Sequence, residues 1–387
     1  MRNVYLLVID GLGVGAQEDA AEYGDEDTNT LAHVCEHTGC RLPNFTKLGL
    51  GNIINLSSVP AVEDPLAAHG KMREVSAGKD STIGHWELAG VQLDRPFPTY
   101  PEGFSQEVVQ AFCRGIGRPE VLCNEPISGT RVIREYGEKH LETGYPILYT
   151  SADSVFQVAA HVDKVPLETL YEWCRFARKK VMIGKHGVGR VIARPFTGEP
   201  GSFERVSEDR RDFSLEPPDD NLVFRLNREG IKTYAIGKVI DLFADRGFTQ
   251  YRKTRANTEG ISQLLSLMSA VQDSFVFINL IDTDQIYGHR RDPDGYARAL
   301  QEIDRAIPVL ASKITNDDLL IITGDHGNDP TVESSDHSRE FVPLLVFPRA
   351  RAETTDLGTR ETFSDVACTV TDFFGLPVSY PGRSFLQ

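Results

Sequence analysis

The chain has 387 residues, of which 40% are hydrophobic, and it carries a formal net charge of -15 at pH 7. This length allows a sizeable core in about two domains, and the acidity argues against a nucleic-acid partner, because phosphate binding requires a basic surface. Six cysteines without CxxC pairs indicate reduced thiols rather than a disulfide framework, with a Cys35–Cys40 pair as the alternative.

The first predicted element is a strand over VYLLVI, residues 4–9. Only six consecutive apolar or aromatic residues precede Asp10, which is too few for the core of a signal peptide or for a membrane span. No other apolar run approaches the ~20 residues that a transmembrane helix needs. We therefore expect a soluble, cytoplasmic protein that has no membrane partner.

The next informative stretch, SAGKDSTIGHWELAG (76–90), offers a nucleophile. Ser81 and Thr82 are expected in a glycine-flanked turn together with Lys79 and His85. The stretch is not a Walker loop, because the first glycine is replaced by Arg73 and Lys79 is followed by aspartate. DGLGVG, after the first strand, lacks the GxGxxG spacing of a dinucleotide site, so both nucleotide-binding readings are weak.

Residues 97–216 differ from their surroundings. The block begins after the proline-rich RPFPTYPEG, contains the strand candidates PILYTS (146–151) and GRVIAR (189–194), and ends in DFSLEPPDDN. It is nearly neutral, with 16 Lys and Arg against 17 Asp and Glu, whereas the rest of the chain carries a net charge of -14. We predict a smaller α/β cap domain, 97–216, inserted into a metal-binding catalytic core formed by 1–96 and 217–387.

Short apolar runs and helical patterns alternate after the inserted block. Strands are predicted at 233–237, 275–281, 319–323 and 342–347, and helical patterns cover 257–272 and 295–314. Each run is apolar on both faces, which is typical of a parallel sheet covered by helices. The sequence therefore predicts an α/β fold with a mainly parallel sheet, in which the first strand is joined by strands from beyond the insertion.

Acidic residues and histidines follow three of these strands. Ligands collect at the carboxyl ends of strands in open α/β sheets, and seven donors are expected at this edge: Asp10, Asp282, Asp284, His289, Asp325, His326 and His337. For a single histidine, the ordinary explanation is a role in the core or on the surface. Here that explanation would have to hold independently for His289, His326 and His337. Such a donor set suits Mn²⁺, Zn²⁺ or Fe²⁺ better than Ca²⁺, and its size favours two adjacent metals.

Together these motifs resemble the phosphopentomutase family of the alkaline phosphatase superfamily. The resemblance runs from the first strand to the C-terminus through VIDGLGVG, GKDSTIGHWE, TSADSV, GVGRVIARPF, IGKVID, NLIDTDQIYGHRRDP, GDHGNDP and DHSREFVPLL. It implies an alkaline-phosphatase-like core with an inserted cap, and the interconversion of (deoxy)ribose 1-phosphate and (deoxy)ribose 5-phosphate. A phosphoenzyme and a bisphosphate intermediate are expected, with a bisphosphorylated sugar as activator.

The resemblance also assigns roles to residues. Asp10, Asp325 and His326 are expected to bind one Mn²⁺, and the other Mn²⁺ is expected on Asp284, His289 and His337. Ser81 takes the place of the phosphorylated residue, where the family usually has threonine, and neighbouring Thr82 is the alternative. The residues expected to hold the pentose phosphate are Ser151, Asp153, Val155, Arg190, Ile192 and Lys238.

Ordinary roles remain open for some of these residues. Arg190 and Arg194 could lie on an exposed strand edge, and Lys238 could be a loop lysine. The core residues alone would also permit a metal-dependent phosphohydrolase or a relative of the phosphoglycerate mutases. A catalytically silent metal- or nucleotide-binding protein is disfavoured, because the nucleophile and the ligand set are both complete.

Overall fold

The computed structural model describes residues 2–151 and 154–386. The chain forms two compact units, one made of Met1–Pro96 and Pro217–Gln387 and the other of Phe97–Glu216. We call them the first and the second unit and describe each by itself.

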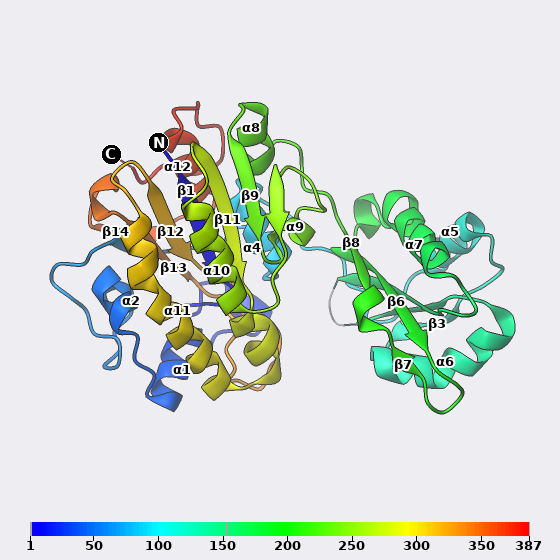
Figure 1. The fold of residues 1–387 in the computed structure, drawn as a ribbon. Helices are drawn as coiled ribbons and strands as arrows, with labels where there is room; N and C mark the ends of the chain where they lie inside the picture. Colours follow the sequence, from blue (N-terminus) through cyan, green and yellow to red (C-terminus); the bar gives the residue numbers. More distant parts are fainter. Residues whose placement is uncertain (1, 152–153, 387) are drawn as a thin grey trace. The chain divides into compact units, whose positions relative to one another are not determined.

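The first unit contains an eight-stranded sheet in the order β10-β9-β11-β1-β12-β13-β2-β14 (Figure 1). Its strands are β1 (Val4–Ile9), β2 (Ala68–Met72), β9 (Lys232–Ile236), β10 (Gln250–Arg252), β11 (Ser274–Leu280), β12 (Leu319–Thr323), β13 (Val342–Phe347) and β14 (Asp356–Arg360). The strands expected at 4–9, 233–237, 275–281, 319–323 and 342–347 are all confirmed. β1 pairs in parallel with β11 and with β12, so strands from after the inserted block flank the first strand.

One strand runs against its expected direction. β13 is antiparallel to both β12 and β2, whereas its apolar sequence was taken as typical of a parallel strand. The chain between β12 and β13, residues 324–341, contains no helix. A parallel return needs a crossover connection, usually a helix, so this loop brings the chain back in the opposite direction.

Helices cover both faces of this sheet. Tyr5, Leu7 and Ile9 share one core cluster with the helices on their side, which are α1 (Thr30–Thr38), α2 (Pro43–Leu48), α10 (Asn257–Met268) and α11 (Pro293–Lys313). On the other face Phe277 packs against His85 and Phe243, where α4 (Ser81–Leu88), α8 (Leu222–Arg228), α9 (Val239–Leu242) and α12 (Asp365–Phe373) lie. Figure 1 shows α10 and α11 running along the sheet. Burial on both faces explains why these strands are apolar throughout.

Shorter elements complete the first unit. Helix α3 (Leu50–Ile53) follows α2 directly, and 3₁₀ turns lie at Ala20–Tyr23 and Arg349–Arg351. α10 ends four residues before the end of the predicted helical pattern, and α11 begins two residues before its predicted start. Asp292 caps α11, since its carboxylate accepts a hydrogen bond of 2.8 Å from the amide of Gly295.

The second unit is built on a smaller mixed sheet. Its order is β3-β4-β5-β6-β7, and β8 also pairs with β6. The strands are β3 (Leu122–Pro126), β4 (Ile147–Thr150), β5 (Val155–His161), β6 (Arg190–Thr197), β7 (Glu204–Arg205) and β8 (Arg211–Ser214). The strands predicted at 146–151 and 189–194 correspond to β4 and β6. Because β6 has neighbours on both sides, Arg190 and Arg194 do not lie on an edge strand.

Helices flank this second sheet too. They are α5 (Gln106–Ile116), α6 (Gly129–Thr143) and α7 (Leu167–Phe176), which continues into a π-helical turn at Ala177–Val181, while 3₁₀ turns lie at Gly184–His186 and Ser207–Asp209. Residues of α5 and α7 pack in one core cluster, and residues of α6 pack in another with Phe196. The second unit thus has its own core, as an independent domain does.

Two further expectations concern the cysteines and membrane-spanning helices. All six cysteines are free thiols, five of them buried. Within residues 2–151 and 154–386, none of the helices has the length and apolarity needed to cross a bilayer.

Candidate active site

Six potential metal ligands gather beyond the carboxyl ends of adjacent strands. Asp10 follows β1, Asp284 follows β11, and Asp325 and His326 follow β12. The four side chains are at most 2% exposed. Together with His289, in the 3₁₀ turn Gly288–Arg290, and His337, in the loop between β12 and β13, they form what we call the ligand cluster: Asp10, Asp284, His289, Asp325, His326 and His337.

Distances divide the cluster into two overlapping sets. The donor atoms of Asp10, Asp325 and His326 lie within 4.8 Å of one another, as do those of Asp284, His326 and His337. The Nε2 atom of His289 lies 3.5 Å from Oδ2 of Asp284. The structure therefore brings together all six residues predicted as ligands, with His326 between the two sets.

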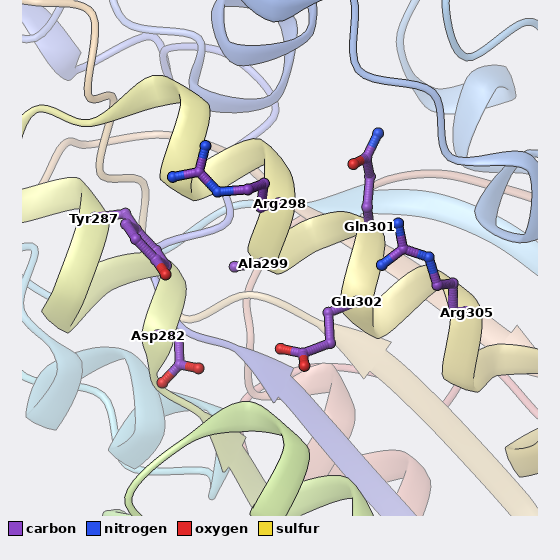
Figure 2. Close-up of a pocket in the computed structure, with 7 residues that line it drawn as sticks. All are labelled: Asp282, Tyr287, Arg298, Ala299, Gln301, Glu302 and Arg305. Carbon is purple, nitrogen blue, oxygen red and sulfur yellow. The ribbon is translucent and has the colours of Figure 1, made fainter.

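Asp282 does not belong to this cluster, although it was expected among the seven donors. Its Oδ2 atom accepts a hydrogen bond of 2.9 Å from the amide of Asn257 at the start of α10. The chain turns helical after Asp282, at Thr283–Tyr287. Asp282 therefore lines a separate cavity with residues of α11, described below (Figure 2).

Backbone carbonyls orient two of the histidines. The Nδ1 atom of His326 bonds to the carbonyl of Gly327 at 3.0 Å, and that of His289 bonds to the carbonyl of Ser335 at 2.7 Å. In both rings Nε2 is therefore the atom that faces the carboxylates. Metal-ligating histidines use this arrangement, in which one nitrogen is fixed by a carbonyl and the other binds the metal.

Two unsatisfied atoms show that the cluster fits a divalent metal. The Oδ2 atom of Asp325 and the Nε2 atom of His337 are buried without a hydrogen-bond partner in the described part of the chain. Buried polar atoms are normally paired, so an exception requires an explanation such as a bound ion. Carboxylate oxygens and imidazole nitrogens in this number suit Mn²⁺ or Zn²⁺.

Electrostatic coupling within the cluster is strong. Burial alone would raise the pKa of Asp284, but the imidazoles of His337 and His289 outweigh burial and lower that pKa well below its usual value. Burial would lower the pKa of His326, yet the carboxylates of Asp325 and Asp10 raise it to about 10. Three buried carboxylates thus draw positive charge to this edge of the sheet.

Ser81 lies at the first position of α4 rather than in the expected glycine-flanked turn. Asp80 caps this helix, accepting hydrogen bonds from the amides of Thr82 and Ile83 at 2.8 and 3.1 Å. The positive end of the α4 dipole lies here, which is favourable for a phosphate group. The turn prediction is wrong because Asp80 begins a helix whose glycine, Gly84, suggested a loop.

The hydroxyl of Ser81 reaches the ligand cluster. Its Oγ atom lies 3.0 Å from Nε2 of His326 and 3.5 Å from Oδ1 of Asp10, and it accepts a hydrogen bond of 2.8 Å from Lys238. No contact of the Thr82 hydroxyl with the cluster is found in the described residues. The geometry thus favours Ser81 over Thr82 as the nucleophile.

Lys238 lies at the end of β9, which neighbours β11 in the sheet. Its ammonium forms an ion pair with Asp10 and lies 3.9 Å from Asp284. Burial opposes the charged form, but the carboxylates of Asp10, Asp284 and Asp325 dominate and raise the pKa of Lys238. Lys238 is therefore a charged group of the site rather than an ordinary loop lysine.

Three supporting residues have roles that the sequence analysis did not predict, although it named His85 beside Ser81. His85 donates a hydrogen bond of 2.8 Å to the carbonyl of Ser81 and bonds to Asn279 at 3.1 Å. The guanidinium of Arg339 binds the carbonyls of residues 74, 76 and 78 in the loop before α4. Glu87 accepts from the amides of residues 75 and 76. The GHWE and DHSRE motifs contained these residues, but spacing alone does not reveal their partners.

The other predicted substrate-binding residues belong to the second unit. Ser151 follows β4, and Val155 pairs with Arg190 where β5 and β6 begin side by side. Val155 and Ile192 are at most 2% exposed, so their side chains are enclosed by the second unit. Arg190 is half-exposed and lies 3.5 Å from Asp212. Asp153 lies outside the described residues.

Comparisons with known proteins agree on one family. The sequence profile of the Metalloenzyme superfamily matches residues 2–378. The phosphopentomutase of Caldanaerobacter subterraneus subsp. tengcongensis is 50% identical over 387 residues, covering 100% of this chain and 98% of that protein. The phosphopentomutase of Deinococcus radiodurans is 50% identical over 384 residues, covering 98% of each chain.

The chain belongs to the phosphopentomutase family. Mutases of this kind are isomerases that transfer a phosphoryl group, and the superfamily and the ligand cluster agree on divalent metal use. The solved structure of the PH0037 protein from Pyrococcus horikoshii has the same fold, with a TM-score of 0.50 at 16% identity over 98% of this chain and 99% of that one. The predicted alkaline-phosphatase-like α/β fold class is confirmed.

Replacing Asp284 by asparagine should abolish the stabilisation by metal, because it removes one carboxylate of the ligand cluster. In the unaltered chain, Mn²⁺ at 100 times its Kd should add about 2.7 kcal/mol to the free energy of unfolding. Thermal melts with and without Mn²⁺ measure this difference. Asp282→Asn, two residues earlier and directed away from the cluster, should keep the metal response; equal losses in both variants would contradict the assignment.

Replacing Gly84 by alanine should displace α4. An added Cβ atom would lie 2.1 Å from the carbonyl oxygen of Asp325, so the helix that carries Ser81 cannot keep its position. We expect a loss of about 1–3 kcal/mol in urea unfolding and a large fall in activity. Gly260→Ala in α10 is the control, since the one close approach of its Cβ would be to the end of the flexible Leu280 side chain, 2.9 Å away. Similar effects of the two changes would contradict this packing argument.

Proposed function

We propose that this chain interconverts (deoxy)ribose 1-phosphate and (deoxy)ribose 5-phosphate through a phosphorylated Ser81 and a sugar bisphosphate. The observation that carries the proposal is the position of the Ser81 hydroxyl at the start of α4, in contact with Lys238, His326 and Asp10. A nucleophile within hydrogen-bond reach of such groups is the arrangement that covalent phosphoryl transfer needs.

The reaction has two transfers. In the first, the free hydroxyl of ribose 1-phosphate, on C5, attacks the phosphorus of phosphorylated Ser81, the bond from phosphorus to Oγ breaks, and the proton of the sugar hydroxyl passes to Oγ. This step gives ribose 1,5-bisphosphate. In the second, Ser81 Oγ attacks the phosphorus on C1, the bond from that phosphorus to the sugar breaks, and the proton returns to the sugar. Ribose 5-phosphate leaves and Ser81 is phosphorylated again.

The chain's own residues prepare Ser81 for this exchange. The Lys238 ammonium donates a hydrogen bond to Oγ, so it can stabilise negative charge on that oxygen when the bond to phosphorus breaks. His85 fixes the carbonyl of Ser81, and Ser81 lies at the positive end of the α4 dipole, which favours a phosphoryl group there. These groups are in place before the reaction, so little reorganisation is required.

The residues that we propose as ligands of two Mn²⁺ ions are Asp10, Asp325 and His326 for one and Asp284, His289 and His337 for the other. When bound, two such ions neutralise charge on the transferred phosphoryl group and stabilise the attacking and leaving oxygens. His326 belongs to both sets of donors. The buried Asp325 Oδ2 and His337 Nε2 atoms form no hydrogen bond in the described residues, although His85 lies 3.1 Å from the first and Asp284 lies 3.4 Å from the second, and this supports the presence of ions there.

We further propose that Ser151, Asp153, Val155, Arg190 and Ile192 of the second unit bind the pentose phosphate. The half-exposed guanidinium of Arg190 suits the phosphate that is not being transferred, whereas the buried Val155 and Ile192 can offer only backbone groups. A bisphosphorylated sugar would serve as activator, because it can restore the phosphate on Ser81 if that group is lost. The six free cysteines support a reducing compartment, the cytoplasm.

Ser81→Ala should abolish the interconversion, since no other hydroxyl bonds to a side chain of the cluster in the described residues; the Thr283 hydroxyl reaches only the backbone carbonyl of Asp10. A coupled assay with Mn²⁺ measures ribose 5-phosphate formed from ribose 1-phosphate, together with free phosphate. Thr82→Ala should retain most activity, and Ser81→Thr should remain active because it keeps a hydroxyl. Full activity in Ser81→Ala would move the nucleophile elsewhere, and stoichiometric phosphate release by the unaltered chain would indicate a phosphohydrolase.

Lys238→Met should lower kcat by about 10²–10³, the effect of removing one hydrogen-bond donor that stabilises transition-state charge. KM should change less, because the contact is with Ser81. Lys253→Met makes the same change at a nearby exposed lysine that pairs with Asp241 at 2.7 Å, and it should leave kcat within about twofold. A loss below tenfold in Lys238→Met would contradict the role given to this ammonium.

A further inference from the structure

A cavity of about 350 Å³ lies outside the ligand cluster, between one face of α11 and the segment that follows β11 (Figure 2). Asp282 and Tyr287 line it on one side, and Arg298, Gln301, Glu302 and Arg305 line it from α11. These four α11 residues recur at spacings of three, four and seven, so they share one face of the helix. The volume lies within the range of small-molecule sites.

The polar residues of the cavity become more exposed from its floor to its rim. Asp282 is 93% buried, being only 7% exposed, and its Oδ1 atom has no hydrogen-bond partner in the described residues. Tyr287, Gln301 and Glu302 are half-buried, while Arg298 and Arg305 are exposed. Figure 2 shows the Tyr287 hydroxyl and the Glu302 carboxylate directed into the space between the two sides.

The floor requires a hydrogen-bond donor. The other oxygen of Asp282 is occupied by the amide of Asn257, so the carboxylate cannot turn away to find a partner. A buried acceptor left unpaired destabilises the protein, and a ligand hydroxyl would satisfy it. A hydroxyl fits better than an ammonium group, because removing a full positive charge from water is far more costly than removing a neutral hydroxyl.

The rim favours an anionic group. Two exposed guanidinium groups, two helical turns apart, can bind a phosphate by charge-assisted hydrogen bonds while it remains partly solvated. Phosphorylated polyols carry both kinds of group, hydroxyls that suit the floor and an anion that suits the rim. We propose that this cavity binds a phosphorylated polyol, with its hydroxyls on Asp282 and Glu302 and its phosphate on Arg298 and Arg305.

This site is distinct from the catalytic one, although one element contributes to both. The helical turn Thr283–Tyr287 ends in Tyr287 of the cavity and contains Asp284 of the ligand cluster. Asp282 precedes this turn directly. A ligand in the cavity would therefore contact the segment that holds a proposed metal ligand, without occupying the place of the transferred phosphoryl group.

D-ribitol 5-phosphate is a suitable probe, since it carries both groups and has no anomeric carbon. We would measure amide hydrogen exchange of the metal-loaded full chain with and without saturating probe, and titrate the probe by calorimetry. The expected result is at least twofold slower exchange in the peptides of α11, residues 293–313. Ribitol alone, inorganic phosphate alone and serine should each bind at least tenfold more weakly at this site. Ribitol lacks the phosphate, inorganic phosphate lacks the polyol hydroxyls, and serine lacks both the phosphate and the chain of hydroxyls.

Variants of the cavity residues test whether the probe binds in this cavity. Arg305→Gln should remove the protection of α11 and weaken this binding at least tenfold, and Glu302→Gln should do the same if Arg305→Gln fails to fold. Lys313→Gln, the same loss of charge on the same helix but outside the cavity, should change neither. The proposal is overturned by unchanged exchange in α11, by protection that persists in Arg305→Gln and Glu302→Gln, or by equal binding of serine or inorganic phosphate.

Discussion

The structure depends on the repulsion among three buried carboxylates at one edge of a sheet. Asp10, Asp284 and Asp325 follow adjacent strands and are almost fully buried. Charges so close in a low-dielectric interior cannot remain uncompensated. Lys238, His289 and His326 supply part of the positive charge, and Asp325 Oδ2 forms no hydrogen bond in the described residues, which leaves it available to a divalent ion. The same electrostatic demand makes this edge a place where the charge of a phosphoryl group can be neutralised.

The core and the loops around it hold this repulsive arrangement in place. Close packing of α4 against the backbone of Asp325, with no room for a Cβ at Gly84, fixes the start of the helix beside the carboxylates. Arg339 and Glu87 bind the backbone of the preceding loop, so the chain enters α4 in one conformation. Burial of β1, β11 and β12 on both faces stabilises the scaffold that these contacts use. The repulsion among the carboxylates is thereby offset by packing elsewhere in the first unit.

Sequence patterns predicted the parts of the structure that depend on local chemistry. Continuous apolar runs located β1, β12 and β13, and the polar residues after β1, β11 and β12 located the ligand cluster, because strand ends in parallel sheets meet at one edge. Two features depended on the path of the chain and on tertiary contacts: the direction of β13 follows from the path of a loop, and the orientation of Asp282 follows from its bond to Asn257. The start of α4 at Ser81 is a local effect of the Asp80 cap, a signal that the predicted turn overlooked.

The central claim is that Ser81 carries the phosphoryl group between the two positions of the sugar. The most direct measurement is phosphopeptide mapping by mass spectrometry after the metal-loaded chain has been incubated with a pentose 1,5-bisphosphate and quenched. One phosphoryl group should appear on Ser81. When excess unlabelled ribose 1-phosphate is added before the quench, an isotopic label on this group should pass to ribose 5-phosphate while Ser81 stays phosphorylated. A phosphoryl group on Thr82, or a chain that turns over substrate without any phosphorylated residue, would contradict the account.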